Sequence, residues 1–105
     1  MDERDTREFG RGPHAARTVR RIVRVVDPDG LHARPCTRIA RAAERFECRI
    51  VVLHGGREAD ARSILDLLGL GVLQAADIEL HATGDDAAAC VAALARIVAG
   101  RPPDT

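Results

Sequence analysis

The residues best suited to chemistry lie in the hexapeptide 30–35, Gly-Leu-His-Ala-Arg-Pro. His32 stands where a predicted strand ends and a predicted helix begins, and the unpaired N–H groups of a helix start bind phosphate and other anions. An imidazole with a free nitrogen could accept a phosphoryl group there and have the incoming charge stabilised. Arg34 carries a planar guanidinium that can bond two phosphoryl oxygens at once, and Pro35 fixes the backbone of a first helical turn. The hexapeptide favours a phosphoryl-accepting site over a histidine that merely caps a helix.

Length, charge and hydropathy limit the kinds of protein that could carry this site. A chain of 105 residues suffices for one domain with one modest core. Sixteen arginines balance sixteen acidic residues, and this neutrality argues against nucleic acid or a membrane surface as partner. Phe9 and Phe46 are the only aromatic residues, too few for base stacking. No apolar run approaches the roughly twenty residues that cross a bilayer, and the charged first residues lack a secretory signal, so we expect a cytoplasmic protein.

The elements that must position the hexapeptide follow from periodicity and turn residues. Residues 1–18 show no periodicity and predict a flexible extension, before a domain over 19–101 and a disordered tail over 102–105. The predicted strands cover 19–26, 49–54, 57–60 and 77–83. The predicted helices cover 33–45, a short segment from Ser63 to Gly69, and a last segment that opens at 84–86 and ends at Gly100. This β-α-β-β-α-β-α order indicates an α+β two-layer sandwich with an antiparallel sheet.

Three segments in register resemble the HPr family, the histidine-containing phosphocarriers of the bacterial phosphotransferase system, and equally its nitrogen-branch relative NPr. Residues 30–35 resemble the family's phosphorylation-site motif, and residues 59–65 its second-helix segment. The 31-residue spacing from His32 to Ser63 is that of the family, and Leu70-Gly71 and residues 82–85 resemble its later turns. The resemblance runs from about Val19 to Gly100. It implies an open-faced sandwich whose four-stranded antiparallel sheet, in the order 1-4-2-3, is covered on one face by three helices.

The resemblance also implies a function, that of a phosphoryl carrier rather than an enzyme. His32 would receive a phosphoryl group on Nδ1 from phospho-enzyme I, itself charged by phosphoenolpyruvate, and pass it to an EIIA-type protein. Arg34 would stabilise that group. No cofactor and no metal are implied, and we expect a monomer. Whether the chain serves the sugar branch or the nitrogen branch stays open.

A partner-binding face made by the first and second helices is implied as well. Its expected members are Ala33, Thr37, Arg38, Arg41, Ile64, Leu65 and Leu68. Arg34, Arg38, Arg41 and Arg45 recur at helical spacing, so they predict one basic stripe, either a solvated face or a surface that steers an acidic partner toward His32. Glu44 and Asp66 depart from the family pattern, which has a basic or neutral polar residue at the first position and glycine or lysine at the second.

Ser63 has two interpretations. Its hydroxyl fits a helix N-cap, the favoured one. In some family members the matching serine is phosphorylated by a dedicated kinase, which weakens docking to enzyme I, so a serine kinase is a candidate partner.

Cysteines and the other histidines offer weaker candidates. Cys36, Cys48 and Cys90 are odd in number and lack a C-x-x-C pair, which predicts reduced, mostly buried thiols. Cys36 lies one turn after His32, but no third ligand or orienting carboxylate is evident, so it is interpreted as a small core residue. His14, His54 and His81 receive no role.

Two other functions remain open. One is a regulatory domain of the same fold that is decoupled from sugar transport, as in nitrogen-branch signalling. The other is a small enzyme or metal-binding module that uses His32 and Cys36.

Overall fold

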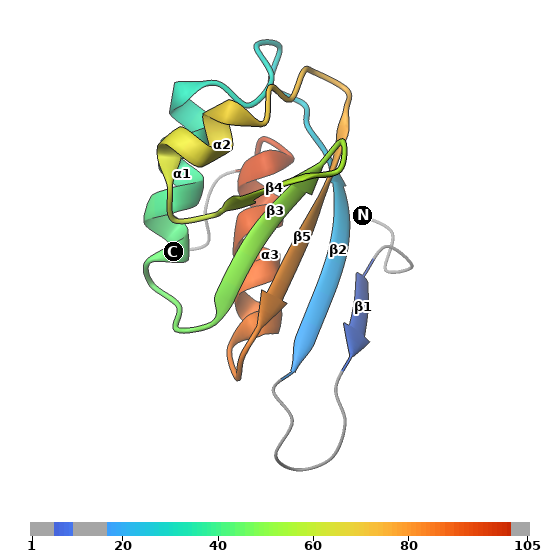
Figure 1. The fold of residues 1–105 in the computed structure, drawn as a ribbon, viewed down its shortest axis with the longest axis vertical. Coiled ribbons are helices and arrows are strands. Elements are labelled where there is room, and N and C mark those ends of the chain that lie inside the picture. Colours follow the sequence, from blue (N-terminus) through green and yellow to red (C-terminus); the bar gives the residue numbers. More distant parts are fainter. Residues whose placement is uncertain (1–5, 10–16, 102–105) are drawn as a thin grey trace.

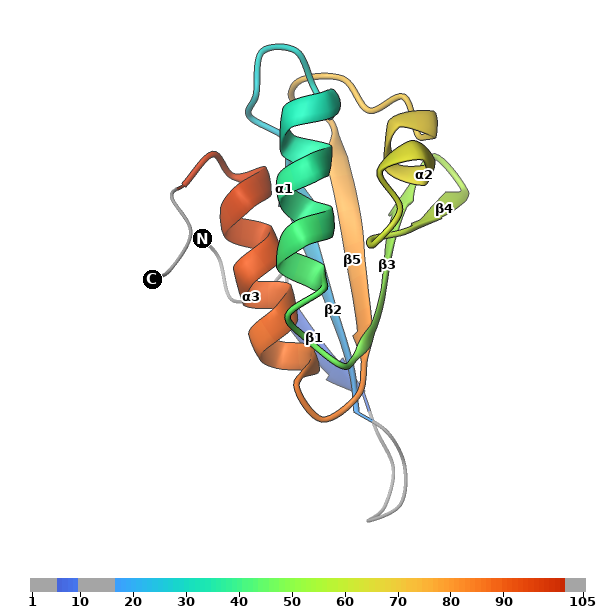
Figure 2. The same cartoon turned by 90° about the vertical axis from the view of Figure 1, so that its left-hand side faces the viewer.

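The computed structural model describes residues 6–9 and 17–101 as five strands and three helices. The strands are β1 (Thr6–Phe9), β2 (Thr18–Arg24), β3 (Arg49–His54), β4 (Arg57–Asp60) and β5 (Asp77–Thr83). The helices are α1 (Ala33–Ala43), α2 (Ile64–Gly69) and α3 (Ala87–Val98). Figure 1 shows the sheet running along the molecule, and Figure 2 shows the three helices on one side of it. The predicted α+β sandwich is confirmed.

The sheet is antiparallel throughout, in the order β1-β2-β5-β3-β4. Without β1 this is the order 1-4-2-3 that the resemblance implied. β5 lies between β2 and β3, so the last strand of the chain joins the two halves of the sheet. β3 and β4 form a hairpin through Gly55 and Gly56, whose positive φ values of 59° and 78° suit a tight turn.

Strand β1 corrects the prediction for the N-terminal segment. Residues 6–9 were expected within a flexible extension, but they pair with β2 from Thr6 opposite Arg21 to Phe9 opposite Thr18. Thr18, also placed in the extension, is the first residue of β2. Because an edge strand is held by backbone hydrogen bonds, four residues can join a sheet without any hydrophobic period in the sequence. The sheet therefore has five strands, not four; residues 1–5, 10–16 and 102–105 lie outside the described part.

The core lies between the sheet and the helices. α1 buries Pro35, Cys36, Ile39, Ala40 and Ala43, and α3 buries a longer apolar face that includes Val91 and Leu94. Burial of each large aliphatic side chain stabilises the fold by about 1.5–3 kcal/mol. Phe46 is only partly buried and packs against this core. α1 ends at Ala43, two residues earlier than predicted, because Arg45 and Phe46 donate to carbonyls three residues back and tighten the chain into a turn.

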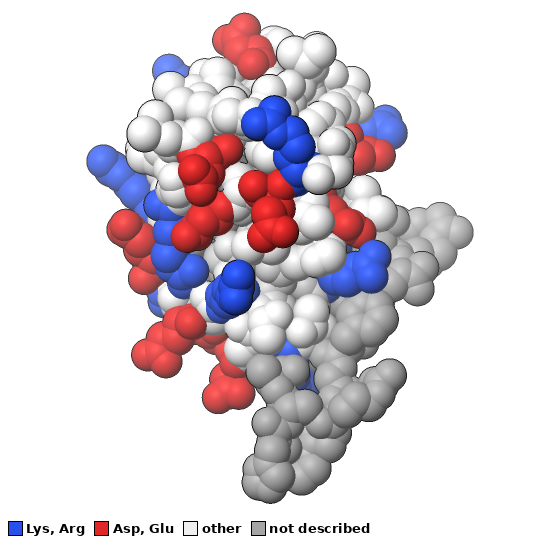
Figure 3. Space-filling view, viewed as in Figure 1, with Lys and Arg blue, Asp and Glu red and all other residues white. Residues whose placement is uncertain are grey.

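The three cysteines and the surface charges agree with the composition. Cys36, Cys48 and Cys90 are buried free thiols, as predicted. Acidic and basic side chains are interspersed on the face shown in Figure 3, without a large area of one sign. Within 6–9 and 17–101 no helix is long and apolar enough to span a bilayer.

Candidate functional site

A tight turn carries the chain from β2 to the start of α1. The Gly30 N–H donates to the Asp27 carbonyl at 2.9 Å, and the Asp29 N–H donates to Asp27 Oδ1 at 2.9 Å. Gly30 has φ +69°, and a Cβ there would collide with the carbonyl oxygen of Val72. That carbonyl accepts the Leu31 N–H at 3.0 Å, so the α2–β5 loop fixes the residue before His32. Only glycine fits this approach without strain.

His32 is the N-cap residue of α1, yet its side chain does not cap the helix. Its backbone is extended, with φ −91° and ψ −168°, and no side-chain cap bond is formed. Pro35 has no N–H, and the Cys36 N–H donates to the His32 carbonyl at 3.1 Å. Within residues 17–101 nothing accepts the N–H groups of Ala33 and Arg34, and the first turn holds no acidic residue. Two donors and the positive end of the helix dipole thus remain open to an anion.

Among the described residues, the imidazole of His32 has a partner on one side only. Its Nε2 lies 3.2 Å from Asp27 Oδ1, and both side chains are 34% exposed. The pKa of Asp27 is lowered, first by the Asp29 N–H, further by His32 and the charge of Arg34, and against an opposing effect of burial. The sequence analysis gave Asp27 no role; an acid five positions before the histidine, at the first position of the turn, was the available signal.

Arg34 lies beside this pair with an exposed side chain. It lines a cavity of about 250 Å³ at the junction of the 27–31 turn, α1 and the end of α3, together with Asp27, Leu31 and Arg38. Since Arg34 has no ion pair with any residue of the described part, its guanidinium is available to a ligand.

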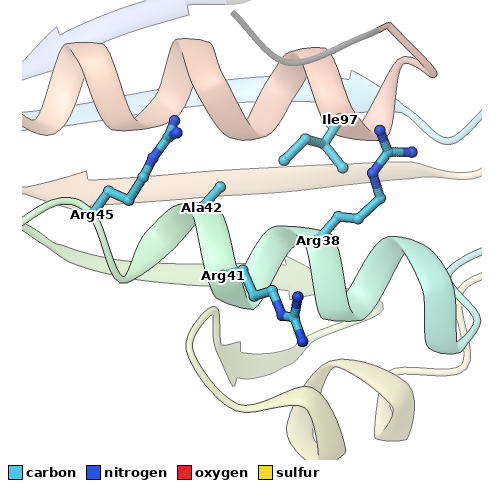
Figure 4. A pocket seen from close by; sticks show the side chains of 5 residues that line it. All are labelled: Arg38, Arg41, Ala42, Arg45 and Ile97. Atoms are coloured by element: carbon cyan, nitrogen blue, oxygen red, sulfur yellow. The ribbon is translucent and has the colours of Figure 1, made fainter. Parts of the chain in front are cut away.

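Arg38 and Arg41 of α1 and Arg45 just after its end follow one helical row but diverge at their tips (Figure 4). Arg38 and Arg45 point toward α3, whereas Arg41 points toward α2. With Ala42 and Ile97 they line a groove of about 210 Å³. The positions of the predicted basic stripe therefore lie in one row, but the guanidinium groups point to two different surfaces, one toward α3 and one toward α2.

The second helix presents the apolar residues expected of a docking face. Leu65 is 80% exposed, and Ile64 and Leu68 are each 37% exposed, while Leu67 alone of this short helix is buried. α2 packs against α1, the helix that carries the exposed Ala33. The Thr37 hydroxyl donates to the Ala33 carbonyl at 2.8 Å within α1. Ser63 caps α2, since its Oγ accepts the Asp66 N–H at 3.1 Å.

The cysteine near His32 and the other histidines add no reactive group to this site. Cys36 is fully buried, its Sγ donates to the Leu31 carbonyl at 3.4 Å, and burial raises its pKa to about 11. It therefore packs in the core, as predicted, rather than acting as a thiolate. His54 Nδ1 lies 3.1 Å from the Asp77 carbonyl, and His81 Nε2 lies 3.1 Å from Glu79 Oε1. His14 lies outside the described residues.

Comparison with known proteins decides the family. The family model described as "PTS HPr component phosphorylation site" matches residues 19–100, which include the whole of this site. The chain belongs to the HPr family. HPr proteins are phosphocarriers of the phosphotransferase system and not enzymes, and this chain is an HPr-like phosphocarrier.

Solved structures and a curated relative agree with this assignment. The phosphocarrier protein HPr from Bacillus anthracis str. Ames superposes with a TM-score of 0.74 at 31% identity, over 77% of this chain and 96% of that one. Crh from Bacillus subtilis, described as a swapped dimer, superposes with a TM-score of 0.66 at 29% identity, over 78% and 94%. A multiphosphoryl transfer protein of Xanthomonas campestris is 42% identical over 71 residues, 68% of this chain. The chain spans only 8% of that relative, which thus includes an HPr-like segment within a far longer protein.

Proposed function

We propose that His32 accepts a phosphoryl group on Nδ1 from phospho-enzyme I and passes it to an EIIA-type protein. The observation that carries this proposal is the uncapped start of α1, where the N–H groups of Ala33 and Arg34 have no partner in residues 17–101. A helix start without a cap or an acidic first turn costs stability unless an anion uses it. The arriving phosphoryl oxygens would take up these donors.

Arg34 stabilises the group in transit. Its side chain is exposed and has no ion pair with a described residue, so it can turn its fork toward two phosphoryl oxygens. A cation in the first turn of a helix is slightly unfavourable, a cost that a bound dianion would offset.

Partner binding uses the face beside the site. The exposed side chains of Ile64, Leu65 and Leu68 supply apolar contact, Ala33 leaves room next to His32, and Arg38 and Arg41 add positive charge. Thr37 contributes mainly its methyl group, since its hydroxyl is bonded within α1. An acidic partner surface with an apolar centre fits this arrangement.

The phosphoryl assignment is tested by incubating the protein with phosphoenolpyruvate and a sugar-branch or nitrogen-branch enzyme I. One acid-labile phosphate should be added to the wild type and to the control His54→Ala, and none to His32→Ala. Arg34→Ala should slow transfer by about 10- to 100-fold, as expected for loss of a charged donor to the transition state. Absence of transfer with both enzymes would overturn the proposal, whereas full-rate transfer in Arg34→Ala would remove only the role of that arginine.

The docking face has its own test. Leu65→Ala should weaken enzyme I binding, measured by titration calorimetry or by the concentration for half-maximal transfer. The matched control is Ile22→Ala, because Ile22 is 42% exposed on β2 and lies outside the proposed face. Equal weakening by both substitutions would move the interface away from α2.

Ser63 acts as the cap of α2, and the kinase-dependent role is the second candidate. A phosphate on Ser63 would bring negative charge to the docking face, where it would repel an acidic partner. A serine kinase of the family that modifies the folded protein, with slower transfer to His32 as the result, would favour regulation.

The cellular setting follows from the phosphocarrier role. We place the protein in the cytoplasm as a monomer without nucleic-acid or membrane partners. Because Crh is described as a dimer, light scattering at several concentrations is the appropriate check on the monomer.

A further inference from the structure

We propose that Asp27 is a positioning residue for His32: its carboxylate accepts the Nε2 proton, so Nδ1 presents its lone pair to the phosphoryl donor. This inference rests on the proposed function of His32 and adds a residue to it. The contact that carries it is the 3.2 Å separation of His32 Nε2 from Asp27 Oδ1.

The Asp27 carboxylate is held in place by the turn that contains it. Oδ1, the atom that faces the imidazole, also accepts the Asp29 N–H at 2.9 Å, and the Asp27 carbonyl accepts the Gly30 N–H at 2.9 Å. An ionised carboxylate has acceptors only, so the ring nitrogen opposite it must donate. A neutral imidazole carries one N–H, and fixing that proton on Nε2 leaves Nδ1 as the nucleophilic nitrogen.

Three charged residues of the described part of the chain make this contact or act on the Asp27 carboxylate. They are Asp27, Asp29 and Arg34, and the ligand atoms of Asp27, Asp29 and His32 all lie within 4.8 Å of one another. Of the two acids, Asp27 makes the ion-pair contact with Nε2, whereas Asp29 contributes its backbone N–H to the turn. Asp29 is therefore a matched control, with the same charge in the same turn but without the contact.

The Asp27 carboxylate would assist transfer in both directions. As the Nδ1 lone pair forms the N–P bond, the bond from phosphorus to the donor breaks and its electron pair stays with the donor. The Nε2 proton remains, so the phosphorylated ring is positively charged and is stabilised by the opposite charge of Asp27. On transfer to the acceptor the N–P electron pair returns to Nδ1, and the ring leaves as neutral imidazole.

Two substitutions separate the geometry of this contact from its charge. Asp27→Asn keeps an oxygen that can accept both the Asp29 N–H and the Nε2 proton, but it removes the negative charge. Asp27→Ala removes both. Asp29→Asn removes a neighbouring charge and leaves the contact in place.

The first measurement is the ring tautomer of unphosphorylated His32, read from ¹⁵N shifts in long-range ¹H–¹⁵N spectra. We expect the Nε2–H form in the wild type, in Asp27→Asn and in Asp29→Asn, and a larger fraction of the Nδ1–H form in Asp27→Ala. A change confined to the fold of the turn would not select one tautomer. Identical ring shifts in Asp27→Ala and wild type would overturn the inference.

The second measurement is phosphoryl transfer from phospho-enzyme I. Because both side chains are one-third exposed, we expect a moderate effect, a fall in transfer rate of about five- to ten-fold in Asp27→Ala. Asp27→Asn should transfer at an intermediate rate and Asp29→Asn at the wild-type rate. Equal losses of transfer rate in Asp27→Asn and Asp29→Asn would assign the effect to the negative charge of the turn as a whole. That result would overturn the role proposed for the Asp27–His32 contact. If the wild type accepts no phosphate, the proposed function fails, and the tautomer measurement still decides whether Asp27 orients the ring.

Discussion

At the N-terminal end of α1, two backbone N–H groups have no partner in residues 17–101, whereas the segment after its C-terminal end is bound by side chains from distant elements. Asp86, at the start of α3, accepts the N–H groups of Glu47 at 2.8 Å and Cys48 at 2.9 Å. Arg62, from the loop after β4, donates through Nη2 to the carbonyls of Phe46 at 2.6 Å and Cys48 at 2.9 Å.

Under the proposed function, the difference separates a segment that hydrogen bonds hold in place from a helix start that is open to a transient ligand. Bonds from Arg62 and Asp86 satisfy backbone groups that would otherwise be partly buried without partners, and such groups are costly. If His32 has the proposed role, the donors at its end of the helix are left open for a phosphoryl group that arrives and leaves repeatedly. A permanent cap would stabilise the helix and compete with that group.

The largest expected effect on phosphoryl uptake comes from replacing His32 with a residue that can cap the N-terminal end of α1. His32→Ser places a hydroxyl at the N-cap, where it can accept the Arg34 N–H, since Pro35 offers none. Phosphoryl uptake should be abolished, while the free energy of unfolding should exceed that of His32→Ala by about 0.5–1 kcal/mol. Urea denaturation and transfer from phospho-enzyme I measure the two quantities. Equal stability of the two variants would show that the start of α1 is not short of a cap.

The second prediction concerns the contact that supports the turn before His32. Gly30→Ala combines φ +69° with a collision against the Val72 carbonyl, so it should lower the free energy of unfolding by roughly 2–4 kcal/mol and slow phosphoryl transfer. Gly56→Ala is the control, because Gly56 has a similar φ of +78° with nothing within 4 Å of a Cβ. Equal losses of stability in both variants would attribute the effect to backbone strain alone and not to the contact with Val72.

The two ends also differ in how far the sequence could predict them. The N-terminal end lies in one short segment, so the types and spacing of His32, Arg34 and Pro35 were enough to place a candidate site at a helix start. The same local rules identified the Ser63 cap, which the structure confirms at 3.1 Å to the Asp66 N–H. Asp27 was missed because its contact with His32 depends on how the turn folds back.

Contacts between residues far apart in the chain could not be predicted from the sequence, because they too depend on how the chain folds back. Asp86 and Glu47 are 39 positions apart, and Arg62 and Phe46 are 16 apart, so no local period relates them. Strand β1 is held by backbone pairing, and side-chain types do not report that. The order of the strands came from the family resemblance rather than from periodicity. The positions of Arg38 and Arg41 on α1 were predictable from helical spacing, but the opposite directions of their side chains were not.

The third prediction concerns the segment after the C-terminal end of α1, which Arg62 binds. Arg62→Met keeps an unbranched stem in place of the side chain but removes the donor to the carbonyls of Phe46 and Cys48. The free energy of unfolding should fall by roughly 1–3 kcal/mol, as expected when partly buried carbonyls lose their partner. Phosphoryl transfer at a temperature where the variant is folded should match the wild type. Arg57→Met, in the exposed hairpin strand, is the control and should change neither quantity. A marked loss of transfer in Arg62→Met would mean that the two ends of α1 are coupled.

The smallest expected effect is a change in the pH dependence of stability. The N–H groups of Glu47 and Cys48 hold the pKa of Asp86 below its usual value, against the effect of burial. A lowered native pKa gives stability that is present above the pKa of the unfolded carboxyl, about 4, and is lost as pH falls through the native pKa. Asp86→Asn has one oxygen for two donors, so it should be less stable than the wild type at neutral pH.

The same substitution should also make the decline of stability below about pH 4 shallower, because one linked proton is removed. Urea denaturation across this range measures the slope, with Asp85→Asn as the control, since the neighbouring Asp85 is exposed. An unchanged slope in Asp86→Asn would place the acid sensitivity elsewhere, and Asp27 is then the next carboxylate to test, because its pKa is lowered as well. In that case acid would destabilise the N-terminal end of α1, at His32, before the segment after its C-terminal end. The opposite order is expected from the hydrogen bonds of the two regions.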